Sequence, residues 1–387
     1  FINLFFLISM SNNLVNEISP YLLQHKNNPV DWYPWNNSSL AIAKSKNLPL
    51  LLSVGYSSCH WCHVMAHESF EDSETAMFMN KNFFNIKVDR EERPDIDLLY
   101  QSSLSLMGQQ GGWPLTMFLD SNLVPFWGGT YFPKKTRHGI PCFLDVLKHI
   151  SNIYQTKKDM IFNNSNAVKR SLSKLFYDSK KSSYNMGDVE ISKNKVKNFF
   201  DNKSGGLTGS PKFPMIPLLR SLSFMSKEKS KINLEIQNWL DKSLTSMCLG
   251  GIYDHLGGGF SRYSTDEFWF VPHFEKMLYD NAQFIEILSI FYSVYGSRLY
   301  RNRVEKTFLW LKSEMLQKDS HGSRYFSAVD ADSNGSEGGY YVWEYGEIQK
   351  VLKDSFNEFS TEYGLLKEGN WENNANILHR INKKLQS

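Results

Sequence analysis

The chain has 387 residues, 41% of them hydrophobic, and a formal net charge of +3 from 43 basic and 40 acidic residues. This apolar content excludes a disordered chain, and the near-balanced, scattered charge argues against a nucleic-acid partner. The length exceeds what one hydrophobic core usually supports, so two domains are expected.

The N-terminal stretch Phe1–Ile8 is apolar, but it has no basic flank and no small-residue cleavage site, so it does not fit a complete signal peptide. A weak or truncated signal is the alternative. Residues 1–12 are therefore expected to be a tail or upstream sequence, with Met10 resembling a natural start. No later segment is apolar over a membrane-spanning length, and the 4 cysteines form no spaced disulfide framework. These features predict a cytoplasmic protein without a membrane partner.

The first half of the chain alternates strand-like and helical patterns. The run Leu48–Val54 is almost entirely apolar and ends at a glycine, which is typical of a strand buried on both faces. Ser57 and Ser58 are candidate caps for one helix that extends from Cys59 to Asn80. The other expected elements are helices at Asn36–Lys46, Pro94–Met107 and within Phe143–Lys174, and strands at Phe83–Asp89, Leu115–Asp120 and Pro125–Phe132. This order predicts an α/β domain with a mixed sheet over residues 13–176.

The second half is predicted to be helical. It follows a polar stretch rich in Ser and Lys at 177–188, which is expected to be a linker, and strand signals nearly vanish beyond it. Helical periods follow at Ile191–Phe200, Ile216–Lys227, Leu234–Leu249, His273–Tyr295, Leu299–Leu316 and Tyr345–Leu352. Helix pairs joined by glycine-rich loops predict an all-α toroid or solenoid over residues 189–387.

The sharpest chemical signal is Cys59-His60-Trp61-Cys62, directly after the predicted buried strand. A thiolate at a helix start faces the positive end of the helix dipole, so we expect Cys59 to have a lowered pKa and to be the nucleophile. Cys62, one turn later, is placed to resolve a mixed disulfide, and a protonated His60 would add to the stabilisation. The motif predicts dithiol–disulfide exchange with a protein thiol or disulfide and without a cofactor.

Three other interpretations of the motif compete. With His63 it is formally a haem-attachment string, but haem c needs an export-side setting. Zinc could be held by Cys59, Cys62 and either His63 or His67, although there is no second such cysteine pair. Two buried cysteines without a role are the third interpretation. Redox exchange is favoured and no metal is predicted, because the pair follows a buried strand.

A proline directly before the third predicted strand supports redox exchange. Thioredoxin folds place a cis-proline there, packed against the cysteine turn, where the loop backbone can bind an extended substrate. Pro114 has this place, although an ordinary turn proline would look the same in sequence. The predicted catalytic residues are Cys59, Cys62, His60, Trp61 and Pro114. Trp32, Trp35 and Trp113 are expected to be core or cleft-lining aromatics, and Cys142 and Cys248 to be structural.

Several long strings carry a family resemblance. They are Ser19–His25 with Asn28–Trp35, Gly55–Met65, Lys87–Asp95, Gly111–Thr116, Ser210–Pro214, Gly250–Phe260 and Pro272–Asn281. The chain strongly resembles the family of spermatogenesis-associated protein 20 and its bacterial homologues. The resemblance implies a thioredoxin-like domain followed by an (α/α) toroid similar to six-hairpin glycosidases and N-acylglucosamine 2-epimerases. Family members continue well past this point, so the chain is expected to be a fragment with a partial, unclosed toroid.

Polar residues in the helical half are candidates for binding a sugar, on which toroids of this kind act. They crowd into a glycine-rich loop and the predicted start of a helix, and are Asp254, His255, Arg262, His273, Glu275, Lys276 and Asp280. Glycoside hydrolysis needs a general acid with a base or nucleophile, and epimerisation needs a proton-abstracting base. The competing interpretation is that Asp254 and His255 cap helices while Glu275 and Lys276 pair on the surface.

The string from Asp330 to Gly335 resembles the first half of an EF-hand loop. Its twelfth position is Tyr341 in place of the bidentate Glu that calcium requires, so calcium is not predicted. Asp330 and Asp332 are instead assigned to a polar loop at the mouth of the toroid that can contact a ligand.

The leading functional hypothesis is a thiol–disulfide redox protein fused to a helical domain. The first alternative is a carbohydrate-active or carbohydrate-binding protein in which the thioredoxin-like domain is structural. The second is a non-catalytic interaction protein. The expected partner is accordingly a protein thiol or disulfide, or a small carbohydrate.

Overall fold

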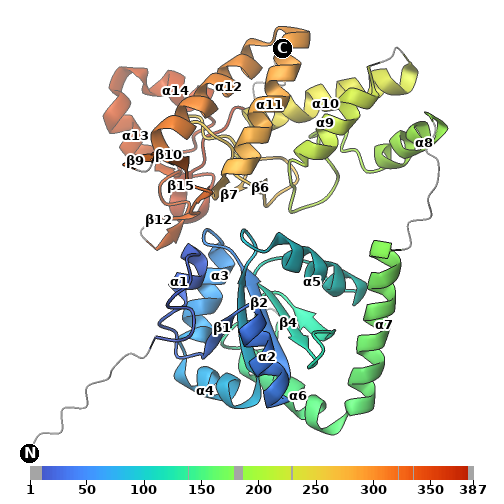
Figure 1. Ribbon diagram of the computed structural model, residues 1–387. Helices are drawn as coiled ribbons and strands as arrows, with labels where there is room; N and C mark the ends of the chain where they lie inside the picture. Colours follow the sequence, from blue (N-terminus) through green and yellow to red (C-terminus); the bar gives the residue numbers. More distant parts are fainter. Residues whose placement is uncertain are drawn as a thin grey trace, which may run out of the picture. The chain divides into compact units, whose positions relative to one another are not determined.

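The computed structural model describes residues 11–137, 139–177, 186–227, 230–320, 322–333 and 335–381 (Figure 1). The chain divides into two compact units, Phe1–Ser182 and Ser183–Ser387, which are described separately. Most of the predicted tail and of the predicted linker lies outside the described residues. In the described part of the chain, no helix combines the length and the apolar character needed to cross a membrane.

A five-stranded mixed sheet forms the centre of the first unit. Its strands are β1 (Trp32–Pro34), β2 (Leu50–Gly55), β3 (Phe84–Asp89), β4 (Leu115–Leu119) and β5 (Pro125–Gly129), in the spatial order β1-β3-β2-β4-β5. Strands β1 and β2 run parallel to β3, whereas β4 runs antiparallel to both β2 and β5. The predicted mixed sheet is confirmed. The edge strand β1 was not predicted, because three residues are too few to show an alternating pattern.

Helices pack around this sheet (Figure 1). They are α1 (Pro20–Gln24), α2 (Asn37–Lys46), α3 (His60–Met65) with the π-helical turn η1 (Ala66–Phe70), α4 (Ser73–Asn82), α5 (Pro94–Leu106), α6 (Phe143–Thr156) and α7 (Lys158–Tyr177). The single helix predicted from Cys59 to Asn80 is wrong. The Asp72 side chain accepts a hydrogen bond from the backbone N–H of Thr75 (3.0 Å) and caps a new helix, α4.

The two faces of the central strands differ in chemistry. Alternate residues of β2 and β3, among them Leu52, Val54 and Ile86, pack with α5 in an apolar core. Because successive side chains of a strand point to opposite faces, Ser53 and Lys87 belong to the other face, and both are fully buried. A buried polar layer therefore lies on the face opposite the apolar core.

The second unit is rich in helices, as predicted. They are α8 (Met186–Lys197), α9 (Ile216–Met225), α10 (Lys231–Leu249), α11 (Leu278–Tyr295), α12 (Arg298–Trp310) with the π-helical turn η2 (Leu311–Met315), α13 (Tyr345–Leu352) and α14 (Phe356–Glu362), with 3-10 turns η3 (Lys353–Ser355) and η4 (Glu372–Asn374). Helices α9 to α12 share one core, in which Leu219, Leu240, Phe284 and Tyr300 are buried.

The prediction that this half is all-α is wrong, because the structure also contains short strands there. Short antiparallel pairs join β6 (Tyr263–Ser264) to β7 (Pro272–His273), β8 (Lys276–Met277) to β11 (Ala328–Val329), β9 (Leu316–Asp319) to β10 (Gly322–Tyr325), β12 (Asp332–Ser333) to β13 (Ser336–Glu337), and β14 (Trp343–Glu344) to β15 (Ala375–Asn376). Each strand has two to four residues, too few for a detectable period. The helix predicted to begin at His273 begins instead at Leu278, after β7 and β8.

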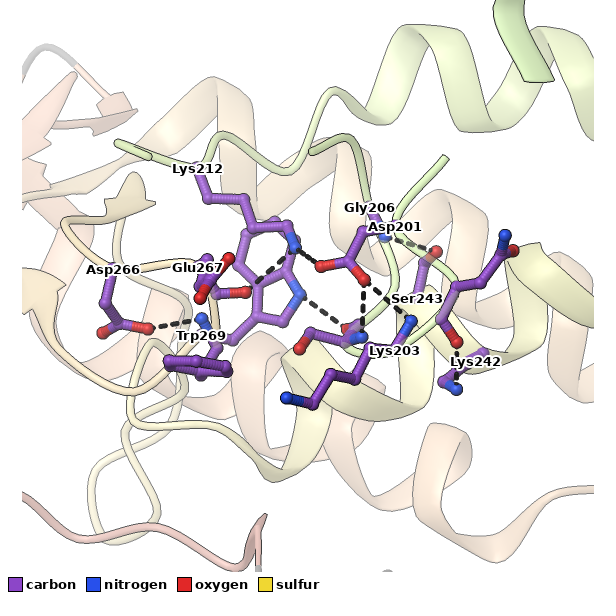
Figure 2. Close-up of polar contacts among 12 residues, drawn as sticks. Asp201, Lys203, Gly206, Lys212, Lys242, Ser243, Asp266, Glu267 and Trp269 are labelled. Carbon is purple, nitrogen blue, oxygen red and sulfur yellow. Dashed lines mark hydrogen bonds and ion pairs between the residues drawn. The ribbon is translucent and has the colours of Figure 1, made fainter. Parts of the chain in front are cut away.

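A buried lysine of the Ser210–Pro214 string holds two loops of this unit together (Figure 2). Lys212 Nζ donates to Asp201 Oδ2 at 2.5 Å and to the Glu267 carbonyl at 3.0 Å. It also lies 5.2 Å from the centre of the buried Trp269 ring. Burial raises the pKa of Asp201, but hydrogen bonds from Lys212 and from backbone N–H groups outweigh it and leave that pKa below its usual value. Lys212 is therefore a structural residue of the loop before α9.

Candidate functional site

The two motif cysteines lie where β2 gives way to α3. Cys59 caps the helix, with its Sγ accepting a hydrogen bond from the Cys62 backbone N–H at 3.2 Å. The two sulfurs form a disulfide, with Cα atoms 5.2 Å apart, and both residues are buried. The cap predicted at Ser57 or Ser58 is thus Cys59 itself. The pair has the position at a helix start and the close approach that redox exchange requires.

Gly55, the last residue of β2, provides the space in which Cys62 packs. A Cβ atom at this position would lie 2.7 Å from Cys62 Sγ and 2.3 Å from Tyr21 Oη, both closer than side chains tolerate. The sulfur and the hydroxyl are therefore neighbours that meet at the backbone of Gly55.

The proline loop lies at the same edge of the sheet. The Trp113–Pro114 peptide bond is cis, and Pro114 is buried. Strands β2 and β4 pair with Val54 opposite Leu115, so the proline before Leu115 lies beside the segment that leads from β2 to the cysteines. The register of the sheet thus places the proline loop next to the cysteine turn.

Side chains of α5 fix this loop. Gln101 Nε2 donates to the Gly112 carbonyl at 2.9 Å, and its Oε1 accepts from the Gly112 N–H at 3.2 Å. Asp97 Oδ1 accepts from Trp113 Nε1 at 2.9 Å. One helix therefore holds both the backbone and the aromatic side chain of the loop.

Arg90 connects the cysteine turn to the proline loop. Its guanidinium carbon lies 4.3 Å from the ring centre of Trp113 and 5.4 Å from that of Tyr56, and its Nε lies 3.5 Å from Asp97 Oδ2. Tyr56 and Trp113 also meet edge to face, with ring centres 5.8 Å apart. A cation between two aromatic rings stabilises both loops in one arrangement.

An aromatic side chain of the motif is open to solvent. Trp61 is 43% exposed and lies near the half-buried His60 and Tyr131, with ring centres 5.5 and 4.9 Å away. Tyr131 donates to Glu68 Oε2 at 2.6 Å, and burial together with this bond raises the pKa of Tyr131 to about 12. The disulfide thus has an exposed aromatic surface on α3 beside it.

The histidines of the zinc alternative have other contacts. His63 Nε2 lies 2.7 Å from the Ser57 carbonyl, and His67 pairs with Glu71 at 3.0 Å on the exposed surface. Since Cys59 and Cys62 are bonded to each other, neither presents the thiolate that binds zinc. Among the other cysteines, Cys142 is half-buried and Cys248 is buried, and neither forms a disulfide.

In the second unit, the predicted sugar-binding residues separate into two groups. Lys276 Nζ donates to Asp254 Oδ2 and to the Gly258 carbonyl, both at 2.8 Å, and is buried. Arg262 Nη1 lies 3.3 Å from Glu275 Oε1, and Glu275 is completely buried. The alternative in which Glu275 and Lys276 pair with each other on the surface is therefore wrong.

His273 lies between two carboxylates of the second group. Its Nδ1 is 2.5 Å from Glu337 Oε1, and its Nε2 is 4.0 Å from Glu275 Oε1. Burial lowers the pKa of His273, but the hydrogen bond to Glu337 and the charge of Glu275 outweigh it and raise the pKa above its usual value. His273 therefore links β7 to the β12–β13 hairpin.

A cavity of about 530 Å³ brings Asp254 and His255 together with aromatic side chains. Its described lining residues include Phe274, Tyr340, Tyr341 and Trp343, but not the other predicted sugar-binding residues. His255 is a poor proton acceptor, because burial, the largest effect, lowers its pKa to about 3. Its Nε2 lies 3.0 Å from the Gly250 carbonyl.

The three remaining predicted residues lie on other elements. Asp280 is in the first turn of α11. Asp332 belongs to the β12–β13 hairpin, and its backbone N–H donates to Asp330 Oδ1 at 3.0 Å. Within the EF-hand-like string, Asn334 lies outside the described residues.

Comparisons with known proteins place this arrangement in a family. Residues 11–173 match the family model Thioredox_DsbH, described as "Protein of unknown function, DUF255". Spermatogenesis-associated protein 20 of Homo sapiens is 38% identical over 391 residues, which cover 93% of this chain and 48% of the relative. The Mus musculus protein of the same name is 39% identical over 364 residues, which cover 89% of this chain and 45% of the relative.

The chain belongs to the family of spermatogenesis-associated protein 20. It spans about half the length of the curated relatives it matches. Its first unit is thioredoxin-like, with a CxxC pair at the start of a helix. A solved structure titled DsbH Oxidoreductase is 16% identical in sequence and superposes with a TM-score of 0.26. The superposition covers 33% of this chain and 86% of the chain in that structure.

Two residues that bear on the site of this family member were not predicted from its sequence. Arg90 drew attention only as part of a string that resembles the family, yet it lies between the rings of the two site loops. Lys87 of β3 is buried opposite Ser53 of β2, with Nζ donating to Ser53 Oγ at 3.0 Å. A signal did exist, because Ser53 and Lys87 are polar residues inside strands that are otherwise apolar.

Proposed function

We propose that the first unit carries out thiol–disulfide exchange at Cys59 and Cys62. The observation that carries the proposal is the bonded pair at the start of α3, next to the cis-proline loop. The thioredoxin-like family match supports it. The partner is a protein thiol or disulfide, and the small number of cysteines supports a reducing, cytoplasmic compartment.

The exchange proceeds by displacement at sulfur. In the reductive direction, a partner thiolate attacks Cys59 Sγ, a sulfur–sulfur bond forms to the partner, and Cys62 leaves with the electron pair of the broken bond. A second partner thiolate then attacks the partner's own sulfur in the mixed disulfide and releases Cys59. Two electrons pass from the partner dithiol to the protein, and the partner leaves as a disulfide. The reverse sequence oxidises a partner dithiol.

The proposal is tested by a redox equilibrium. The full chain is incubated with dithiothreitol at graded ratios of its reduced and oxidised forms, quenched in acid and alkylated, and the peptide with Cys59 and Cys62 is analysed by mass spectrometry. We expect one two-electron transition that is lost in Cys59→Ser and kept in the control Cys142→Ser. A disulfide that does not form at any ratio would contradict the proposal.

As a second function, we propose that the second unit binds a small carbohydrate and forms part of an (α/α) toroid of the six-hairpin glycosidase type. The cavity lined by Phe274, Tyr341 and Trp343 beside Asp254 favours this, because few polar groups among aromatic walls are typical of a ligand pocket. The shared core of α9 to α12 supports the helical arrangement.

Carbohydrate binding is tested separately from redox exchange. A panel of monosaccharides and disaccharides is screened by the shift in Tm of the full chain and of a Cys59→Ser, Cys62→Ser double variant. We expect a sugar that raises Tm equally in both, and a loss of this effect in Tyr340→Ala, an exposed position that lines the cavity. The absence of a shift with every sugar would refute this second function.

A further inference from the structure

The inference concerns a buried hydroxyl group that the exchange mechanism has not used. Tyr21 lies on α1, within the Ser19–His25 string, and is completely buried. Its Oη makes no hydrogen bond of normal distance and angle in the disulfide form of the protein. An unsatisfied buried hydroxyl is unfavourable and uncommon in folded proteins. A partner for Tyr21 in another state of the protein would account for it.

The position of the hydroxyl points to the sulfur of Cys62. The two atoms lie 2.3 and 2.7 Å from the same point, the site of a Cβ on Gly55, so the hydroxyl oxygen and the sulfur are at most 5.0 Å apart. Burial, reinforced by Asp89, raises the pKa of Tyr21 well above its usual value. The hydroxyl therefore keeps its proton and can act as a donor.

The hydrogen-bonding capacity of Cys62 depends on the redox state. A sulfur in a disulfide is a weak acceptor, whereas a thiolate carries a full charge and accepts strongly. Cys62 becomes a thiolate whenever the bond to Cys59 breaks, and it is then a buried anion that needs a donor.

We propose that Tyr21 is the hydrogen-bond donor that stabilises the Cys62 thiolate when the Cys59–Cys62 bond opens. This inference rests on the proposed exchange function. In the reductive step, the partner sulfur bonds to Cys59 Sγ, the Cys59–Cys62 bond breaks, and Cys62 leaves with the electron pair. The Tyr21 hydroxyl turns towards that charge and keeps its proton. No further oxidant or reductant is needed beyond the partner dithiol.

Ser53 is a competing hydrogen-bond partner for the Tyr21 hydroxyl. A weak side-chain hydrogen bond with Ser53 acts to lower the pKa of Tyr21, although burial outweighs it, and Ser53 Oγ also accepts from Lys87 Nζ at 3.0 Å. Lys87 Nζ itself lies 5.1 Å from the centre of the Tyr21 ring. A bond from Tyr21 to Ser53 would form in both redox states, whereas a bond to Cys62 forms only in the reduced state. The two cases therefore differ in their effect on the redox equilibrium.

The test compares two tyrosine-to-phenylalanine variants of the full chain. Tyr21→Phe removes the hydroxyl and keeps the ring. Tyr100→Phe is the matched control, because Tyr100 is equally buried and its hydroxyl donates to the Leu123 carbonyl, which takes no part in the exchange. The equilibrium constant for reduction by dithiothreitol is measured near pH 8, together with the rate of reduction.

We expect Tyr21→Phe to lower the equilibrium constant for reduction by about tenfold, as for the loss of a hydrogen bond to a charged group, and to slow reduction in parallel. Tyr100→Phe leaves both unchanged. Stability to urea should be kept or raised by Tyr21→Phe in the disulfide form and lowered in the reduced form. Equal stability changes in the two forms, or an unchanged equilibrium constant, overturn the inference in favour of Ser53. If the wild-type disulfide is not reduced at all, the proposed exchange function fails first.

Discussion

At the scale of single residues, the site depends on close approaches that only certain side chains allow. The sulfur of Cys62 and the hydroxyl of Tyr21 both pack against the backbone of Gly55. Arg90 fills the space between Tyr56 and Trp113. The contact at Gly55 leaves no room for an additional atom, so a single added methyl group is an informative change there.

Gly55→Ala is expected to destabilise the first unit by about 1–3 kcal/mol, because the added methyl group overlaps with Cys62 Sγ and Tyr21 Oη and overpacks the site. Urea unfolding of the oxidised chain measures this. Gly112→Ala is the control, because the nearest atom to its added Cβ is a methyl group at 3.4 Å, an ordinary contact. Equal stability of the two variants would show that the packing at Gly55 is looser than described.

Some residues of the site could be predicted from the sequence, and others could not. Cys59, Cys62 and Pro114 were found because their chemistry is local: a cysteine pair after an apolar run, and a proline before another strand. Tyr21 and Arg90 could not be assigned, because each comes from a segment about 30 or more residues away that the sheet brings to the cysteines. A sequence pattern contains no information on such pairings unless relatives are compared.

At the scale of elements, several helices were predicted close to their bounds, whereas a helix break and the short strands were not predicted. The predicted helix at Tyr345–Leu352 has the same bounds as α13. The predicted helix from Cys59 to Asn80 missed the break at Asp72, where a side-chain cap starts α4. The short strand pairs of the second unit are held by contacts distant in sequence, such as His273 with Glu337, so local propensity gives no signal for them.

Lys212→Met is expected to destabilise the second unit by about 3–5 kcal/mol, because it leaves the carboxylate of Asp201 without its buried cation. The control Arg220→Met removes an ion pair to Glu286 in which both side chains are nearly half exposed, so its expected effect is at most about 1 kcal/mol. Chemical unfolding followed by tryptophan fluorescence measures both. A Lys212→Met effect as small as that of Arg220→Met would contradict the structural role of the buried pair.

The His273–Glu337 pair is expected to make the second unit pH-dependent. The pKa of folded His273 is raised above the unfolded value of about 6.5, so the pair contributes fully below about pH 6.5 and is lost as pH rises through the folded pKa. The unfolding free energy of wild type minus that of His273→Gln should therefore be largest in mild acid and fall towards alkaline pH. His149→Gln, at an exposed histidine outside the second unit, is the control for the loss of an imidazole group as such. A difference for His273→Gln that grows with pH would contradict the assignment.

At the scale of the whole molecule, the chain combines two units of different character. The first is a thioredoxin-like domain, in which a mixed sheet positions a cysteine pair and a proline loop at one edge. The second is helix-rich, with buried ion pairs and an aromatic cavity. Two domains, an α/β unit and then a helical one, were expected from length and pattern. The short strands and buried charges were not, because both arise from tertiary contacts.

The central claim, exchange at Cys59 with Cys62 as the leaving sulfur, is tested most directly by trapping a mixed disulfide. The Cys62→Ser and Cys59→Ser variants of this chain are incubated with oxidised glutathione, and the adduct is located by mass spectrometry. The account predicts rapid glutathione addition to Cys59 in Cys62→Ser, reversed by dithiothreitol, and a much slower reaction of Cys62 in Cys59→Ser. An adduct at neither cysteine, or faster addition to Cys62 than to Cys59, would contradict it.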